Sequence, residues 1–361
     1  MRHTALPSRV RYEARTSHVV LPRPSWPFPV RRLPRLSWLL KAGLTAALLV
    51  LLIRLADPAQ ILHLAAAASL PMLLLALALM PLNLLLEGSM WHLLVRLEIP
   101  DQPFRRSLGA MLCGYAVGFF TPSSVGEFAG RAWYLPHDDK WALSAMVLAE
   151  RMVAMAVVVI PGTGALALVL AHRPLPYADA WTALLLVGAL AGGGLAAVLL
   201  MPRPVYRLVG RLPRGHRAQR HLGFLLTIRH GRIAALLGLG LLRYAGYVAQ
   251  FFVLLRAFLP EAPLWEGLQG VMLVFYTKFL IPSITLLDLG IREGASVFFF
   301  GHLGLPDAVG LQASLLVFAL HLLIPAALGL PFLLRLRVSR PEGFALPIWL
   351  RRRAVSPDDS R

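Results

Sequence analysis

The sequence has few charged residues and a single cysteine. Only 15% of its 361 residues are charged, whereas 57% are hydrophobic, and soluble domains carry roughly 25% charged residues. This scarcity of charge excludes an ordinary soluble domain and indicates a polytopic membrane protein. The one cysteine, Cys113, excludes an intrachain disulfide and a cysteine-based metal cluster. It lies in an apolar stretch, where a small side chain serves packing.

Sequence motifs for catalysis and for metal binding are also lacking. The chain contains no HExxH, no P-loop, no GxGxxG after a strand and no histidine pair at metal-ligand spacing. Its acids within apolar surroundings stand beside arginines, which keep carboxyl groups ionised rather than poised as general acids. We therefore expect no catalytic residue, no metal site and no cofactor.

Acidic residues are half as numerous as basic ones. The chain has 18 Asp and Glu against 36 Lys and Arg, so its formal net charge is +18. The arginines cluster in short segments that flank apolar runs, rather than along one polar element, so we expect no nucleic-acid partner. This pattern follows the positive-inside rule. Such clusters also attract anionic lipids, by about 1 kcal/mol per residue near the surface.

Long apolar runs make up most of the chain. Runs close to the length of a membrane helix, about 20 residues, lie near 37–55, 61–86, 104–120, 142–170, 181–201, 232–258, 265–281 and 306–334. The first run is interpreted as an anchor and not a cleaved signal, because another apolar run follows directly. The predicted domains are a disordered basic cytoplasmic tail at 1–36, a transmembrane domain at 37–337 and a second cytoplasmic tail at 338–361. The transmembrane domain has two halves, at about 37–170 and 181–337.

The distribution of arginines predicts the topology. Arg-rich stretches, which the positive-inside rule places in the cytoplasm, are 2–35, 203–220 and 335–353. Connections with few basic residues, which should face outward, lie near 55–60, 171–180 and 259–264. Both termini are then cytoplasmic, and the chain has six full spans and two hairpins.

The two hairpins should enter the membrane from opposite faces. Residues 104–141 begin and end inside, and residues 265–305 begin and end outside. A 17-residue arm extends about 25 Å, just short of a core of ~30 Å. Whether each hairpin is re-entrant or crosses fully as two thin spans stays open.

A common order of residues links the two hairpins. Each contains Pro-Ser, an acid, Gly, Arg, Leu-Pro and a further acid, in that order. In the first hairpin these are Pro122-Ser123, Glu127, Gly130, Arg131, Leu135-Pro136 and Asp138. In the second they are Pro282-Ser283, Asp288, Gly290, Arg292, Leu305-Pro306 and Asp307. Interrupted segments at corresponding positions of an inverted repeat mark the binding sites of secondary transporters. The predicted fold class is therefore an all-α polytopic membrane protein, an inverted repeat of three spans plus a broken or re-entrant hairpin in each half. Chance similarity is the alternative.

Charged residues within the apolar segments form the candidate binding site. A charge at the centre of a spanning helix costs about 2.5–3.5 kcal/mol on insertion scales. Together with the helix breaker of the first hairpin, the candidates are Pro122, Glu127, Arg131, Glu150, Arg151, Asp288, Arg292 and Glu293. A broken helix presents N–H groups that attract an anion, and arginine binds oxyanions bidentately. We expect the arginines to hold a phosphate, and the acids to hold those arginines or a cationic headgroup.

Two of these pairs have the spacing of helical ion pairs. Glu127 and Arg131 are four residues apart on one helical face, and Asp288 and Arg292 repeat the relation. The alternative to a substrate cavity is a buried pair that only stabilises the hairpin. Glu293 lies one position beyond Arg292 and is expected to face elsewhere.

Glu150 and Arg151 are adjacent within their predicted span. Adjacent residues point about 100° apart on a helix, so each needs a partner on another element. We expect Arg151 to face the first hairpin, and a purely structural brace is the alternative. His321, near Arg151 when the halves are aligned, is either a hydrogen-bonded packing residue or a proton-coupling group.

Four segments, GYAVGFFTPSSVGEFAGRAWYL, ALSAMVLAERMVAM, IPSITLLDLGIREGASVFF and HLGLPDA, resemble the flippase-like membrane family. That family includes the transmembrane region of lysylphosphatidylglycerol synthase, the multiple peptide resistance factor. The resemblance covers roughly residues 37–337, and the matching residues are Pro122, Gly126, Glu127, Arg131, Glu150, Arg151, Pro282, Gly290 and Glu293. Departures are Ser123-Ser124 where Gly is more usual, and His321 where Arg is expected.

The resemblance implies translocation of an anionic or headgroup-modified lipid, or of a lipid-linked intermediate, across the cell (inner) membrane. The full synthase adds a cytoplasmic aminoacyl-transferase domain, and about 24 residues after the last predicted span are too few for it, so we expect a transporter and not an enzyme. Expected partners are a phospholipid or polyprenyl-linked substrate and the membrane. Alternatives are a non-transporting scaffold for a lipid-modifying enzyme or glycosyltransferase, and a membrane enzyme acting on a lipid phosphate.

Overall fold

The computed structural model describes residues 66, 68–119, 121, 124–173, 175–211, 226, 228–281 and 290–334. Every regular element among them is a helix, which confirms the predicted all-α class. Several predicted features lie outside the described residues, namely the tails at 1–36 and 338–361, the first span at 37–55, and the candidates Pro122 and Asp288.

Five helical segments of the described chain are long and apolar enough to cross a membrane. They are α3 (Leu70–Val95), α6 (Lys140–His172), α7 (Ala178–Leu200), α10 (His230–Phe258), and the continuous run of α13 (Asp307–Phe318), η4 (Ala319–Leu323) and α14 (Ile324–Leu334). Each follows one of the predicted apolar runs, and α3 extends past Trp91, beyond the predicted end of its run at 86. The protein is therefore a multi-pass membrane protein.

Shorter helices form the two predicted hairpins. The first consists of α4 (Phe104–Phe119) and α5 (Gly126–Tyr134), and the second of α11 (Leu264–Leu280) and α12 (Ile291–His302). The longest of these, α11, has 17 residues and extends about 26 Å, less than a ~30 Å hydrocarbon core. These lengths favour re-entrant elements, whereas insertion from opposite faces and the inverted repeat remain predictions.

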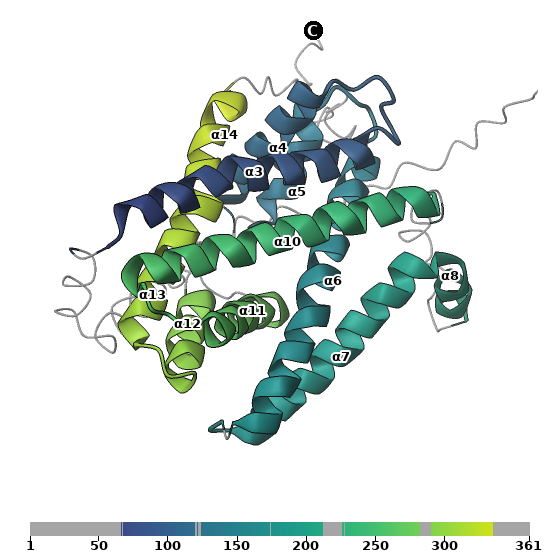
Figure 1. The fold of residues 1–361 in the computed structure, drawn as a ribbon. Coiled ribbons are helices and arrows are strands. Elements are labelled where there is room, and N and C mark those ends of the chain that lie inside the picture. The colour runs from purple at the N-terminus through teal and green to yellow at the C-terminus, as the bar shows by residue number, and fades with distance from the viewer. Residues whose placement is uncertain are drawn as a thin grey trace, which may run out of the picture. The chain divides into compact units, whose positions relative to one another are not determined.

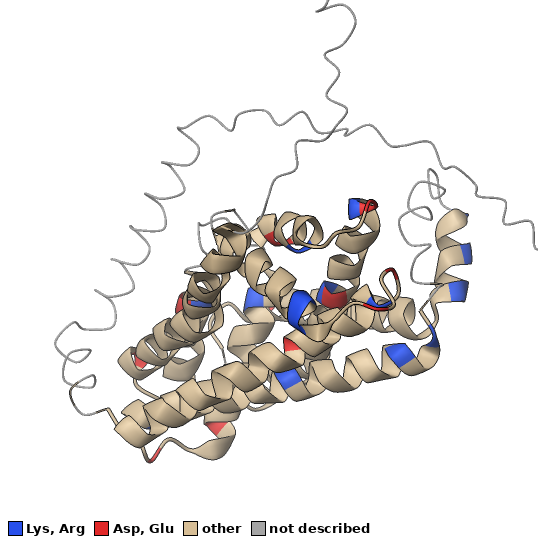
Figure 2. Cartoon of the chain, turned by 90° about the horizontal axis from the view of Figure 1, so that it is seen from above, with Lys and Arg blue, Asp and Glu red and all other residues tan. Residues whose placement is uncertain are grey.

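Helix α10 packs along α3 and separates the two hairpins in the view of Figure 1. The first hairpin packs against α14 and α6, and the second packs against α6 and α13. Helix α6 thus contacts both hairpins. Figure 2 shows that most of each long helix carries no charge and that the acidic and basic positions are few.

A further helix, α8 (Pro202–Gly210), lies where an Arg-rich loop is predicted. Its Arg203 and Arg207 are four residues apart and exposed, and Pro202 is its only buried residue. The charge pattern that identifies a cytoplasmic segment does not distinguish a loop from a short amphipathic helix. For this reason the sequence did not predict α8.

Candidate functional site

Close packing between α4 and α5 places Arg131 inside the protein. A Cβ atom on Gly130 would lie 2.8 Å from the Cα of Gly114, and a Cβ atom on Gly114 would lie 2.6 Å from the Cγ of Arg131. Glycines at these two positions therefore let the helices approach and leave room for the arginine side chain, as expected of small residues in membrane helices. The Arg131 side chain is only 1% exposed.

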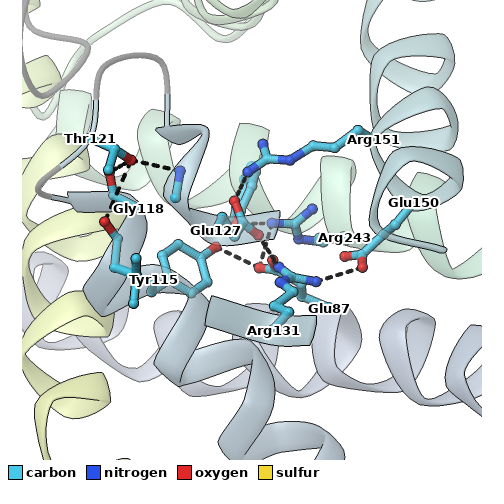
Figure 3. A network of polar contacts seen from close by, with 12 residues as sticks. Glu87, Tyr115, Gly118, Thr121, Glu127, Arg131, Glu150, Arg151 and Arg243 are labelled. Atoms are coloured by element: carbon cyan, nitrogen blue, oxygen red, sulfur yellow. Dashed lines mark hydrogen bonds and ion pairs between the residues drawn. The ribbon is translucent and has the colours of Figure 1, made fainter. Parts of the chain in front are cut away.

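Arg131 forms ion pairs with three carboxylates from three helices (Figure 3). Its Nη2 lies 2.5 Å from Oε1 of Glu87 on α3, and its Nη1 lies 2.6 Å from Oε2 of Glu150 on α6. Nη2 also pairs with Glu127, one turn earlier on α5, which is the predicted pair. The guanidinium lies over the ring of Trp91, 5.4 Å from its centroid. Arg131 thus joins α5 to α3 and α6.

Two more arginines extend this network (Figure 3). Arg151 pairs with Glu127, so it faces the first hairpin as predicted. Arg243 on α10 donates from Nη2 to Oε2 of Glu87 at 2.6 Å, and the Tyr115 hydroxyl on α4 donates to the same oxygen at 2.6 Å. We call Glu87, Glu127, Arg131, Glu150, Arg151 and Arg243 the charge network.

The formal charges of the charge network cancel, since it has three acids and three arginines. A buried group of charges is tolerated when each charge is paired. Its members differ in exposure: the side chains of Arg131 and Arg243 are 1% and 14% exposed, whereas that of Arg151 is 46% exposed. Arg151 is therefore the arginine of the network that a ligand reaches without opening the protein.

The position of Arg151 along α6 follows from the charges of that helix. The 20 residues from Met152 to Ala171 carry no charge and extend about 30 Å, the thickness of the hydrocarbon core. Glu150 and Arg151 precede this segment, and His172 and Arg173 follow it. By this length, Arg151 and Arg173 would stand near the two edges of the core, whereas the predicted span at 142–170 placed Glu150 and Arg151 inside it.

The second hairpin holds a separate cluster around Arg292 and Glu293. Nη2 of Arg292 lies 2.5 Å from Oε1 of Glu293, and Nε of Arg292 donates to the hydroxyl of Ser314 at 3.1 Å. The backbone N–H of Gly290 donates to Oε2 of Glu293 at 2.8 Å, which caps α12 at a glycine with φ of 111°. No ion pair joins this cluster to the charge network in the part of the chain that the structure describes.

The expectation that Glu293 faces away from Arg292 was wrong. The two residues are adjacent, but Glu293 stands in the first turn of α12, where its carboxylate turns back to the N-terminus of the helix. The long Arg292 side chain reaches that carboxylate from the neighbouring position. The predicted pairing of Arg292 with Asp288 falls outside the described residues.

His321 lies in a buried polar group between α3 and α10. It shares a hydrogen bond of 2.8 Å with Oε1 of Gln250, which also accepts from Nδ2 of Asn83 at 2.8 Å. The ring stacks on Tyr247, whose hydroxyl accepts from Arg243 at 2.7 Å. A π-helical turn, η4, carries His321, and such turns are frequent at functional sites. These contacts are those of the predicted hydrogen-bonded packing residue.

Glu87, Arg243, Tyr115 and Gln250 were not among the predicted site residues. A signal for Glu87 existed, because it is the only charged residue in the 26 residues of α3, and the cost of burying a charge applies to it as to Glu127. Tyr115 and Gln250 carry no charge and give no comparable signal. No group of three or more metal-ligating side chains lies close together among the described residues.

Comparison with known protein families shows the family to which the chain belongs. A family model described as Lysylphosphatidylglycerol synthase TM region matches residues 38–329. Neither the curated proteins nor the solved structures contain a match. Because the matched region covers most of the chain, the protein belongs to the lysylphosphatidylglycerol synthase TM region family, as the resemblance implied.

Proposed function

From this family membership and the charge network, we propose that the protein moves an anionic or headgroup-modified lipid, or a polyprenyl-linked intermediate, between the leaflets of the cytoplasmic membrane. The observation that carries the proposal is the 46% exposure of Arg151 at the edge of an otherwise buried, neutral network. A guanidinium binds a phosphate bidentately. Arg151 is therefore the proposed first contact of the substrate phosphate.

Substrate binding at Arg151 would compete with Glu127. The carboxylate of Glu127 pairs with Arg151 on α6 and with Arg131 on its own helix. A phosphate that takes Arg151 leaves Glu127 with Arg131 alone, and this weakens the attachment of α5 to α6. A ligand shifts a conformational equilibrium by its difference in affinity for the two states, so this exchange of partners would couple lipid binding to movement of the first hairpin.

Arg131 has a positioning role in this proposal. Both of its terminal nitrogens are already engaged by carboxylates from α3, α5 and α6. Direct contact with a phosphate would leave some of these acids buried and unpaired, which is strongly unfavourable. Arg131 therefore keeps the carboxylates in place, and we do not place it on the substrate.

A membrane scaffold for a lipid- or sugar-modifying enzyme is the second candidate. The charge balance of the network favours it, because a neutral set of ion pairs stabilises helix packing without any ligand. A scaffold has no need for an exposed Arg151, however, and replacement of Arg151 would leave its function unchanged. The two candidates therefore differ at this residue.

Lipid transfer in reconstituted vesicles tests the proposal. The purified protein would be placed in liposomes with fluorescent phosphatidylglycerol or phosphatidylethanolamine, and transfer followed by dithionite quenching of the outer leaflet. We expect transfer by the wild-type protein, strong loss in Arg151→Gln, and no change in Arg207→Gln, which removes an exposed charge on α8. Equal transfer in all three proteins would contradict the role of Arg151. The absence of transfer above empty liposomes would favour the scaffold.

A further inference from the structure

A cavity of about 340 Å³ lies at the end of α6 remote from Arg151. It is lined by Leu168, Val169, His172, Arg173, Trp265 and Gln269. Leu168, Val169 and His172 belong to the C-terminal end of α6, and Arg173 directly follows it. Trp265 and Gln269 belong to the first turns of α11. Its volume falls in the range of small-ligand pockets, roughly 300–1,000 Å³. None of its lining residues belongs to the charge network.

Gln269 is the first indication of a ligand. Its side chain is 8% exposed and lines the cavity, and it has no hydrogen-bond partner among the described residues. No atom of this amide is among the buried side-chain atoms that lack a partner, so the amide is accessible from the cavity. A ligand in the cavity that accepts a hydrogen bond from the Gln269 amide would supply this partner.

Arg173 contributes donors to the same cavity, and His172 lines it. Nη2 of Arg173 lies 3.4 Å from Oε1 of Glu266, longer than the roughly 2.7–2.9 Å of a strong charge-assisted hydrogen bond, and the Arg173 side chain is 40% exposed. Nδ1 of His172 donates to the carbonyl of Leu168 at 2.8 Å, so Nε2 of the neutral ring is an acceptor and does not donate to a phosphate. The cavity thus has a positive, hydrogen-bonding side.

We infer that this cavity binds the phosphodiester headgroup of a membrane phospholipid. Arg173 and Gln269 would donate to the phosphate oxygens. Leu168 and Val169 provide an apolar wall, and Trp265 is 62% exposed at the start of α11, a position typical of aromatic residues at the boundary of a bilayer. Free phosphate would satisfy the donors but not the apolar wall, so the lipid is the occupant we assign.

The inference rests on the proposed function, because it gives the transported lipid a second binding position. Twenty uncharged residues of α6 separate Arg151 from His172, about 30 Å along the helix. One phosphate site would lie near each edge of the hydrocarbon core, both held by the same helix. A lipid that leaves one leaflet at Arg151 would then reach the other leaflet beside Arg173.

Glu266 regulates access to Arg173. Its carboxylate is the recorded partner of that guanidinium, so a phosphate must displace or share it. Removal of the carboxylate by Glu266→Gln should tighten binding by about two- to fivefold, the contribution of a partly exposed ion pair. An increase of affinity on mutation separates a binding site from a simple structural contact.

Binding of dioctanoyl phosphatidylglycerol to the full-length protein tests the inference. The titration would be made by calorimetry in the wild-type protein and in Arg151→Gln, in which the charge network does not contribute. In the Arg151→Gln background, Arg173→Gln or Gln269→Leu should weaken binding about tenfold or more, and Arg173→Lys should restore part of it. Arg256→Gln is the matched control, because Arg256 bonds to the carbonyl of Ala262 outside the cavity. It should bind as well as its background.

Unchanged binding in both Arg173→Gln and Gln269→Leu, with all variants folded by thermal denaturation, would overturn the inference. Equal affinity for inorganic phosphate would overturn the lipid as the occupant. The proposed function fails separately: if the wild-type protein transfers no lipid in vesicles but the cavity variants still lose lipid binding, the cavity is a lipid site on a protein that does not translocate. If only Arg151→Gln loses binding, the lipid binds at the charge network and not in the cavity.

Discussion

The two hairpins share an order of residues but differ in how their arginines are held. In the first hairpin, Arg131 pairs with acids from three helices, α3, α5 and α6. In the second, Arg292 pairs with its neighbour Glu293 and with Ser314 on α13. The first arrangement connects distant segments of the chain, whereas the second is nearly local. A repeated sequence pattern therefore does not imply two equivalent sites.

The difference concerns access as well as partners. The network of the first hairpin ends in Arg151, which is 46% exposed, whereas Arg292 and Glu293 are 5% and 0% exposed at their side chains. His321 stands where the resemblance led us to expect an arginine, and it bonds to Gln250 rather than to an acid. The structure therefore gives an accessible cation to the first half of the protein and a closed cluster to the second.

Replacement of Arg131 should have the largest effect on stability. Arg131→Met leaves Glu87, Glu127 and Glu150 without their shared partner, and removal of one member of a buried ion pair costs about 3–5 kcal/mol. Thermal or chemical denaturation in detergent would measure it. A loss below about 1 kcal/mol would show that the network contributes little to folding.

The equivalent replacement in the second hairpin should be milder. Arg292→Met leaves one acid, Glu293, which keeps its hydrogen bond from the backbone of Gly290. We expect a loss of about 1–3 kcal/mol, the cost of a partly satisfied buried polar group. A loss equal to that of Arg131→Met would remove the distinction between the hairpins.

Glycine replacements test the close approach that places Arg131. A Cβ atom at position 114 would lie 2.6 Å from the Cγ of Arg131, whereas one at position 118 would have its nearest neighbour at 3.4 Å. Gly114→Ala should therefore cost about 1–3 kcal/mol through overpacking, and Gly118→Ala should be close to neutral. Denaturation of the two variants side by side gives the comparison, and equal costs would contradict it.

The smallest effect on stability is expected at Arg151. Because this side chain is 46% exposed, solvent screens its pair with Glu127, and Arg151→Gln should cost at most about 1 kcal/mol. Lipid transfer should nevertheless fall strongly. A variant that is as unstable as Arg131→Met would show that Arg151 supports the fold and would remove the reason to place it on the substrate.

Much of the fold was predictable because hydrophobicity and charge act locally along the chain. Apolar runs predicted each spanning helix in the described part of the chain, and α6 and α10 begin and end within two residues of the predicted bounds. The breaks after α4 and before α12 follow the positions where the apolar runs are interrupted. The pairing of Glu127 with Arg131 was predictable for the same reason, since four residues make one helical turn.

By itself, the sequence determined the membrane class, the hairpins and the local pair on α5. Only the tertiary structure decided that Glu87 and Arg243 complete the network, and that Arg173 and Gln269 share a cavity. Glu87 and Arg243 are 156 positions apart, and no local spacing relates them. Such partners are selected by the packing of α3 against α10, because a buried charge is stable only where the fold supplies its counter-charge.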